Sequence, residues 1–401
     1  MDHRLIQELV TPANTKIVLL VLDGLGGLPG KPDGLTALEK ADTPHLDNLA
    51  GRGICGLHEA VRAGITPGSG AGHLALFGYD PVEFRIGRGV LAALGTGFEL
   101  RRNDVAARGN FCTIDEGGNV VDRRAGRIPT DKNEELCELL REIELPDVEL
   151  FVEPVKEHRF LLVLRGEGLS GEVSDTDPQA TGRAPLEPKP HGSEASRTAE
   201  LVGRFARQAR ERLAGHEPAN MVLLRGFATL PEWPSFQEIY NLKAAAIASY
   251  PMYLGVARLL GIKTVDTGPS FEEKLASLRE HWDEFDFFFV HVKGTDSSGE
   301  DGDFARKVRE IERVDAAIPR LLELRPDVVI VTGDHSTPAV LRAHSWHPVP
   351  VVLWSEYCRS DPVKRFGERA CVEGGLGPHF PATDLMPLAL ANALRLEKFG
   401  A

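Results

Sequence analysis

Short apolar runs are the most regular feature of the chain. Three of them lead into acidic or imidazole side chains: 17–22 before Asp23, 285–290 before His291, and 328–331 before Asp334 and His335. Runs of Val, Ile, Leu and Phe without polar alternation are typical of strands buried on both faces, as in a parallel sheet covered by helices. A fourth run, 349–354, contains Pro350, which predicts an edge strand or a strand start.

Helical patterns separate these runs, at 44–52, 244–260, 271–281 and 303–324. Pro319 should kink or interrupt the last of them. Alternating strands and helices predict an α/β fold with a doubly wound, mostly parallel sheet, whose ligands bind at the carboxyl ends of the strands. We therefore expect the polar residues that follow the strands to converge on one crevice: Asp23, Asp296, Asp334 and His335.

The middle of the chain has a different character. From about residue 99 to residue 234 it is rich in turns and arginine, and its apolar runs are shorter, as at 160–164. We interpret 101–234 as a smaller α/β domain inserted into a discontinuous main domain formed by 1–100 and 235–401.

Composition narrows the class of protein. The chain has 401 residues, and 46 Lys and Arg against 59 Asp and Glu give a net charge of −13. Its 42% hydrophobic and 26% charged residues are ordinary for a soluble globular protein. The acidic balance argues against nucleic acid or an anionic membrane as partner, because both require a basic face. A small anionic substrate is still compatible with this net charge if arginine, lysine or metal ions make the binding site locally positive.

The cellular compartment also follows from sequence patterns. The five cysteines are widely spaced and form no CxxC pair, so we predict neither a disulfide framework nor a thiolate zinc site. The first residues lack a signal-peptide pattern, and no apolar run approaches the roughly 20 residues of a membrane helix. We expect a cytoplasmic protein, and leave open whether it forms a homo-oligomer.

Several acidic and histidine side chains are candidate metal ligands. Asp334 and His335 at a strand end can reach one divalent cation together with Asp23, or they are a capping carboxylate and a hydrogen-bonded imidazole. Asp296 and Glu300 share one face if a helix begins there, but an acidic first turn also complements a helix dipole. Further along, His344 or His347 could complete a second cation site, and their spacing does not decide between them.

The loop 66–73 is the remaining candidate for chemistry. Glycines on both sides of Ser69 allow a close approach of the backbone to a ligand. If the apolar residues after it open a helix, Ser69 lies at a helix N-terminus, which favours bound phosphate. The loop matches neither a Walker motif, because the lysine is absent, nor a hydrolase elbow, because Pro67 and Ala71 replace the required glycines. Ser69 is thus either a nucleophile or a plain turn serine.

The chain resembles the archaeal-type, cofactor-independent phosphoglycerate mutases of the alkaline phosphatase superfamily. The resemblance covers nearly the whole length, in the order 21–24, 66–81, 87–89, 157–160, 174–178, 243–248, 294–296, 333–338 and 344–345. It implies interconversion of 2-phosphoglycerate and 3-phosphoglycerate, in glycolysis and gluconeogenesis, through a phosphoserine and two divalent ions, without 2,3-bisphosphoglycerate. The implied fold is alkaline-phosphatase-like, with an inserted domain.

The resemblance also implies roles for individual residues. Ser69 is the nucleophile, and Lys243 lies near the phosphate. The first metal is bound by Asp23, Ser69, Asp334 and His335, and the second by Asp296, Glu300 and His344. The implied substrate-binding residues are Arg159, Arg225, Arg124, Arg127, Asp122 and His73.

Glu300 departs from the family, which usually has His at this position. A carboxylate hardens the second site, so we expect Mn²⁺, with Mg²⁺, Co²⁺ and Zn²⁺ as alternatives. Two other functions use the same features: a metal-dependent phosphohydrolase or mutase for another small phosphorylated metabolite, and a non-catalytic module that binds such metabolites after losing its second metal.

Overall fold

The computed structural model describes residues 2–30 and 34–400. The chain forms two compact units: a main unit of Met1–Arg85 with Trp233–Ala401, and an inserted unit of Ile86–Glu232. The second boundary is close to the expected 234/235. The first precedes the expected 100/101, because α5 (Arg88–Thr96) packs against strands of the inserted unit.

The main unit is built on an eight-stranded sheet. In spatial order its strands are β13 (Gly377–Pro381), β2 (Ile54–Glu59), β12 (Val349–Ser355), β11 (Val328–Thr332), β1 (Ile17–Leu22), β10 (Phe287–Val292), β8 (Ala244–Ile247) and β9 (Lys263–Thr264). All neighbours pair in parallel except β12, which is antiparallel to both β11 and β2. The predicted α/β class with a mostly parallel sheet is therefore confirmed. Pro350 lies at the start of β12, within the sheet rather than at its edge.

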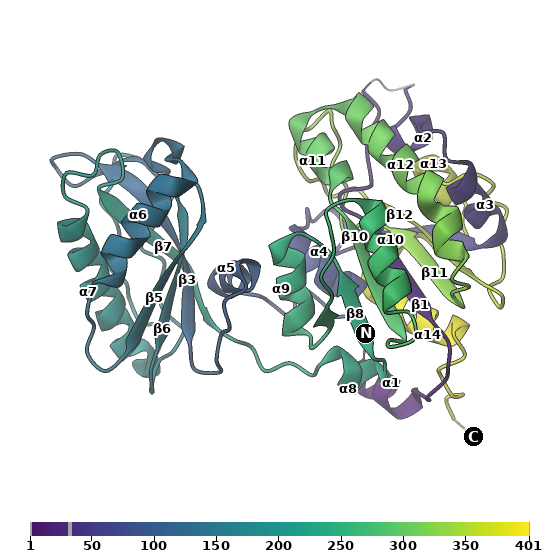
Figure 1. The fold of residues 1–401 in the computed structure, drawn as a ribbon, viewed down its shortest axis with the longest axis horizontal. Coiled ribbons are helices and arrows are strands. Elements are labelled where there is room, and N and C mark those ends of the chain that lie inside the picture. Colours follow the sequence, from purple (N-terminus) through teal and green to yellow (C-terminus); the bar gives the residue numbers. More distant parts are fainter. Residues whose placement is uncertain (1, 31–33, 401) are drawn as a thin grey trace. The chain divides into compact units, whose positions relative to one another are not determined.

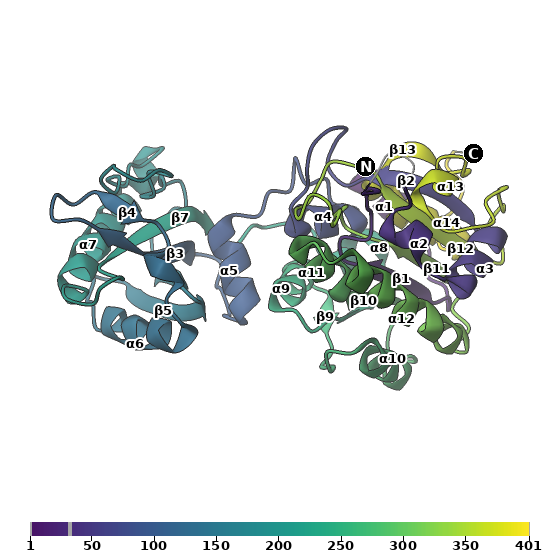
Figure 2. The same ribbon diagram turned by 90° about the horizontal axis from the view of Figure 1, so that it is seen from above.

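Helices lie on both faces of this sheet (Figures 1 and 2). They are α1 (His3–Leu9), α2 (Ala37–Lys40), α3 (Pro44–Arg52), α4 (Ser69–Leu76), α8 (Phe236–Tyr240), α9 (Pro251–Leu259), α10 (Phe271–Glu280), α11 (Gly294–Asp301), α12 (Phe304–Leu322), α13 (Glu368–Cys371) and α14 (Leu385–Asn392). On one face, α3, α10 and α12 bury their apolar stripes against alternate residues of β1, namely Val18, Leu20 and Leu22. α12 continues through Pro319. No helix in the described ranges has the length and apolar character needed to cross a bilayer.

One predicted helix, 244–260, is wrong in its first part. Residues Ala244–Ile247 form β8, and only Pro251–Leu259 is helical, as α9. Alanine favours helices, but here β8 pairs in parallel with Phe287–Val290 and all four of its residues are buried. Tertiary pairing of the strand outweighs this local preference.

The inserted unit has an antiparallel five-stranded sheet. Its strands are β3 (Val105–Ile114), β4 (Val120–Asp122), β5 (Glu149–Lys156), β6 (Arg159–Arg165) and β7 (Met221–Thr229), with β3 paired to β4, β6 and β7, and β6 to β5. On one face, α6 (Thr130–Arg141) and α7 (Ser196–Arg212) cover an apolar core. On the other, α5 packs against strands β3 and β7 (Figure 1) and buries a small apolar cluster around Ala93 and Ala106.

Candidate metal centre and arginine face

The predicted metal ligands meet at one end of the main sheet. Asp23 directly follows β1, Asp334 and His335 follow β11, and Asp296 lies in α11, which begins just after β10. Because β1 lies between β10 and β11 and is parallel to both, the three carboxyl ends are adjacent. The sheet thus brings together residues that are more than three hundred positions apart.

Four electron-pair donors surround one point. His335 Nε2 lies 3.1 Å from Ser69 Oγ, 3.3 Å from Asp23 Oδ1 and 3.2 Å from Asp334 Oδ2. Asp23, Asp334 and His335 are fully buried. Oδ1 of Asp23 and Oδ2 of Asp334 have no hydrogen-bond partner within the described part of the chain. Two buried, unsatisfied carboxylate oxygens facing an imidazole nitrogen form a donor set that can hold a divalent cation.

Hydrogen bonds orient both histidines for metal binding. Thr337 Oγ1 donates to Asp296 Oδ1 over 2.6 Å, so its oxygen accepts from His335 Nδ1, 3.0 Å away. His344 Nδ1 donates to the Pro67 carbonyl over 3.0 Å. In both rings the proton is therefore on Nδ1, which leaves the Nε2 lone pair available to a cation.

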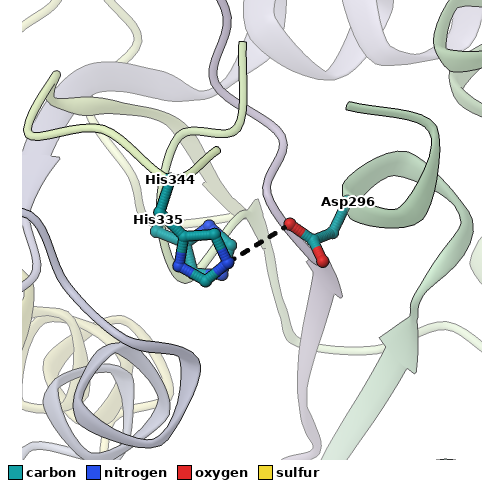
Figure 3. Close-up of side chains that lie close together, drawn as sticks. All are labelled: Asp296, His335 and His344. Carbon is teal, nitrogen blue, oxygen red and sulfur yellow. Dashed lines mark ion pairs between the residues drawn. The ribbon is translucent and has the colours of Figure 1, made fainter. Parts of the chain in front are cut away.

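A second group of ligands lies beside the first. The carboxylate of Asp296 points toward the imidazoles of His335 and His344, which stack with 3.6 Å between ring centroids (Figure 3). His344 Nε2 lies 3.6 Å from Asp296 Oδ1 and 3.8 Å from Glu300 Oε1. The Glu300 side chain is 54% exposed and lies at the rim, outside this compact group. His335 therefore lies between the two groups of candidate ligands, and Glu300 is peripheral to the second.

Ser69 is the first residue of α4, so the predicted helix begins at this serine. Gly72 lets α4 approach β11 closely, because a Cβ at this position would collide with the Asp334 carbonyl. Gly68 provides no side-chain cap, so N–H groups of the first turn stay available to an anion. A serine hydroxyl next to buried carboxylates and a helix N-terminus can bind or attack a phosphoryl group.

His73, predicted to bind substrate, is fully buried one turn after Ser69. Its Nδ1 donates to the Ser69 carbonyl over 2.8 Å and lies 3.2 Å from Asp334 Oδ2. The ring stacks on Tyr253 with 4.5 Å between centroids. This environment gives His73 contacts to site residues and no access to solvent, so the structure places it in the support of the site rather than on its surface.

Three residues around Asp23 were not predicted as site residues. Lys293 Nζ lies 3.0 Å from Asp23 Oδ2 and 2.6 Å from Asp296 Oδ2, and Tyr253 and His291 also donate to Asp23 Oδ2. Occupying Oδ2 in this way directs Oδ1 of Asp23 toward the first group. Lys293 and His291 could have been found from their position at the end of β10, whereas nothing in the sequence marks Tyr253.

Burial and neighbouring charges shift the pKa values of the groups around Asp23. Burial alone would raise the pKa of Asp23, but the hydrogen bond from His291, the neighbouring imidazole of His335 and the charge of Lys293 hold it well below its ordinary value. Burial lowers the pKa of His291 to about 4, so this imidazole is neutral at pH 7. For His335 the opposing effect of burial is outweighed by Asp334 and Asp23, and its pKa is raised. Buried carboxylates that stay ionised are suited to bind a cation.

The inserted unit carries a face rich in arginine. Arg108 on β3 pairs with Arg225 on β7, and its pKa is lowered to about 10 by burial and by the charges of Arg88, Arg159 and Arg225. Arg108 Nε and the Oδ1 of the buried Asn110, two residues along the same strand, have no hydrogen-bond partner among the described residues. Partly buried, mutually repelling guanidinium groups with unsatisfied donors can bind an anion.

Arg124, Arg127 and Arg159 extend this face. All three are exposed, and their charges add to the effect of burial in lowering the pKa of His158 to about 4. Asp122 accepts hydrogen bonds from the backbone N–H groups of Arg124 and Gly126, so it shapes the turn that holds these arginines. Arg225 is restrained by Asp175 and Asp177, each 3.5 Å away. The predicted arginines therefore gather, and Asp122 supports them through the backbone.

Comparisons with known proteins agree on one family. The sequence profile of the 2,3-bisphosphoglycerate-independent phosphoglycerate mutases matches residues 50–219. A probable enzyme of this name from Thermus thermophilus is 50% identical over 99% of this chain and 98% of its own length. The chain belongs to this family. Another relative, from Thermotoga neapolitana, is 49% identical over 100% of this chain and 99% of its own length.

Solved structures lead to the same family. A cofactor-independent phosphoglycerate mutase from Thermoplasma acidophilum is 31% identical, with a TM-score of 0.73 over 94% of this chain and 100% of its own. A protein from Pyrococcus horikoshii, also 31% identical, has a TM-score of 0.82 over 96% of this chain and 99% of its own.

One residue carried over from the family resemblance, Lys243, is placed away from the metal centre. It is exposed and directly precedes β8, and its carbonyl accepts from the backbone N–H of Asp286, which precedes β10. Both residues are at the amino ends of parallel strands, whereas Asp23 and Asp334 follow carboxyl ends. The four residues of β8 extend for roughly 13 Å, more than a lysine side chain can span. In this structure Lys293, not Lys243, is the lysine of the metal centre.

Proposed function

We propose that this chain interconverts 2-phosphoglycerate and 3-phosphoglycerate through a phosphoserine on Ser69, with two divalent ions. The observation that carries the proposal is the convergence of Ser69 Oγ with the unsatisfied oxygens of Asp23 and Asp334 at His335 Nε2. Membership of the mutase family supports the choice of reaction. We place the reaction in glycolysis and gluconeogenesis, in the cytoplasm.

The donors fit two divalent cations. Asp23, Asp334, His335 and Ser69 would hold the first, and Asp296 and His344 the second, with Glu300 as an outer carboxylate. Such ions supply Lewis-acid neutralisation of the charge on a transferring phosphoryl group. Because carboxylate oxygens outnumber imidazoles, we propose Mn²⁺ as the preferred ion, with Mg²⁺, Co²⁺ and Zn²⁺ as alternatives.

The protein's own groups would carry the transfer in two steps. Ser69 Oγ gives up its proton and forms a bond to phosphorus as the bond between phosphorus and the glycerate oxygen breaks, and the released alkoxide takes up a proton. The other hydroxyl of glycerate then attacks the phosphoserine, gives up its proton and restores Ser69. The first-turn N–H groups of α4 stabilise the phosphoryl oxygens.

The arginine face would hold the rest of the substrate. Arg159 and Arg225, with Arg108, Arg124 and Arg127, offer guanidinium groups to the carboxylate and phosphate of phosphoglycerate. Retaining glycerate while Ser69 carries the phosphoryl group distinguishes a mutase from a hydrolase. A protein with a net charge of −13 needs such a local reversal of charge to bind a phosphorylated acid.

A single assay separates the mutase from the runner-up, a phosphohydrolase. Metal-depleted protein is supplied with Mn²⁺ and 3-phosphoglycerate, and 2-phosphoglycerate and free phosphate are followed separately. We expect 2-phosphoglycerate to reach equilibrium with little free phosphate. Prompt release of phosphate without isomerisation would identify a hydrolase. If the protein binds Mn²⁺ but does not convert 3-phosphoglycerate, its substrate is another phosphorylated metabolite.

A further inference from the structure

A buried lysine outside the ligand set connects the loops that carry the ligands. Lys307 on α12 is fully buried, and its Nζ donates to the carbonyls of Gly24 over 2.7 Å, Gly26 over 3.0 Å and Thr337 over 2.8 Å. An ammonium has three N–H groups, and all three are used. Gly24 and Gly26 belong to the turn after β1, and Thr337 to the loop after β11.

Each of these contacts is one residue or one hydrogen bond from a metal ligand. Gly24 follows Asp23, and its N–H donates to Asp334 Oδ1 over 3.1 Å. Thr337 contacts both Asp296 and His335 through its hydroxyl. The Gly26 carbonyl also accepts from the Thr337 N–H over 3.0 Å, so it joins the two loops directly. Lys307 is therefore at the centre of the backbone that fixes four ligands.

The close approach of these loops leaves little freedom to compensate for a change. Gly24 has a φ of +62°, and a Cβ there would lie 2.8 Å from Asp296 Oδ1 and against Thr337 Oγ1. The peptide of Gly24 thus has its N–H on Asp334, its carbonyl on Lys307 and its Cα against Asp296. Tilting this peptide would move ligands of both proposed cation sites.

The chemistry of Lys307 is unusual for a residue that only fills space. Within the described ranges its ammonium hydrogen-bonds to backbone carbonyls and to no carboxylate, and burial lowers its pKa to about 8. Burying a charge satisfied only by neutral carbonyls is costly compared with an apolar side chain of the same size. Three carbonyls aimed at one ammonium instead give directional restraint on the two loops.

We propose that Lys307 is a positioning residue of the metal centre, which sets the ligand geometry of both cation sites by fixing the Gly24–Gly26 turn to the Thr337 loop. The proposal rests on the proposed metal centre. It predicts that the carbonyl contacts of Lys307 matter for metal affinity beyond their contribution to folding.

The test compares Lys307→Met with Lys274→Met. Lys274 on α10 is also buried, and its Nζ donates to the Pro269 carbonyl over 2.9 Å, away from the ligand loops. Free Mn²⁺ is measured by electron paramagnetic resonance in titrations of the metal-depleted proteins, alongside their melting temperatures. We expect Lys307→Met to raise the Mn²⁺ dissociation constants by about tenfold or more, whereas Lys274→Met loses stability and keeps parental affinity.

Several outcomes decide between the hypotheses. Parental Mn²⁺ affinity in folded Lys307→Met would overturn the proposal. It would also be overturned if Lys274→Met lost as much Mn²⁺ affinity as Lys307→Met. If the parent itself binds no Mn²⁺, the proposed metal centre fails instead.

Chemical rescue keeps the test valid if Lys307→Met does not fold. Lys307→Ala leaves a cavity that n-propylammonium can fill, whereas tetramethylammonium has the charge but no N–H donors. Mn²⁺ affinity restored only by n-propylammonium supports directional restraint. Equal restoration by both cations, or by neither, would overturn it.

Discussion

At Ser69, the proposed chemistry depends on a single hydroxyl. Its Oγ lies 3.1 Å from His335 Nε2 at the start of α4, where phosphoryl oxygens can reach free N–H groups. The motif around it predicted this environment, because glycines before an apolar run indicate a loop that opens a helix. The position of Ser69 at a helix start could thus be predicted from the sequence. The residues that contact its hydroxyl could be identified only from the fold.

We expect Ser69→Ala to lower mutase activity by at least about 10³-fold, because the variant lacks the hydroxyl that is proposed to accept the phosphoryl group. Ser277→Ala is a matched control: Ser277 has the same 9% exposure and donates to the Asp266 carbonyl from α10. Initial rates and melting temperatures of both variants are measured with Mn²⁺. Activity in Ser69→Ala near that of the control would rule out the phosphoserine mechanism.

His158 reports the charge of the arginine face. Burial, and then Arg159, Arg124 and Arg127, lower its pKa to about 4 by disfavouring the imidazolium. Arg159→Ala removes one positive charge, so we expect the pKa of His158 to rise while staying below 6.5. NMR titration of the His158 ring protons measures the shift. Arg212→Ala, which removes an arginine paired to Glu142 elsewhere in the unit, should leave it unchanged. An equal response to both variants would mean that the charge of Arg159 does not act on His158.

At the scale of elements, α11 carries the departure from the family. The sequence predicted that Asp296 and Glu300 share a helix face, and α11 spans both residues. It did not indicate that Asp296 would be buried and Glu300 half exposed at the rim, 3.8 Å from His344 Nε2. Side-chain exposure at a helix end depends on how the helix packs, which spacing alone does not determine.

We expect Glu300→His to shift metal preference from Mn²⁺ toward Zn²⁺ or Co²⁺, because an imidazole softens the donor set. Metal-depleted protein is titrated with each ion, and both affinity and activity are followed. Asp301→His provides the control, since Asp301 is exposed, one residue away, and paired with Arg306. If Glu300→His and Asp301→His keep the parental order of affinities, Glu300 is no ligand.

Strands were more predictable than the residues that support the site. The apolar runs of β1, β11 and β12 were found within a residue or two, because a strand buried on both faces leaves a continuous signal. β8 was missed because four alanine-rich residues read as helix until β10 pairs with them. The assignment of Lys243 to the site came from the family resemblance alone, and no pattern in the sequence supported it. Tyr253 and Lys307 were not identified because their partners come from elements distant in sequence, whereas Lys293 was overlooked although one of its partners, Asp296, is three residues away.

At the scale of the whole molecule, the two units divide the chemistry. The acidic ligands belong to the main unit and the clustered arginines to the inserted unit, each built around its own apolar core. The net charge of −13 conceals this separation. Local charge, rather than total charge, decides what each unit binds.

Separate cores predict separate responses to metal. In the proposed function Mn²⁺ binds only the folded main unit, so at a concentration of 100 times its dissociation constant each bound ion should stabilise that unit by about 2.7 kcal/mol. The inserted unit has no share in the proposed ligands and should keep its stability. Differential scanning calorimetry with Mn²⁺ or with a chelator should therefore show one transition that moves and one that does not. Phe160→Leu identifies the transition of the inserted unit, because Phe160 is fully buried in its core. This substitution should lower the free energy of unfolding of that unit by about 1 kcal/mol, and so lower its transition temperature. A metal-dependent shift of the transition that Phe160→Leu lowers would contradict the assignment of all ligands to the main unit.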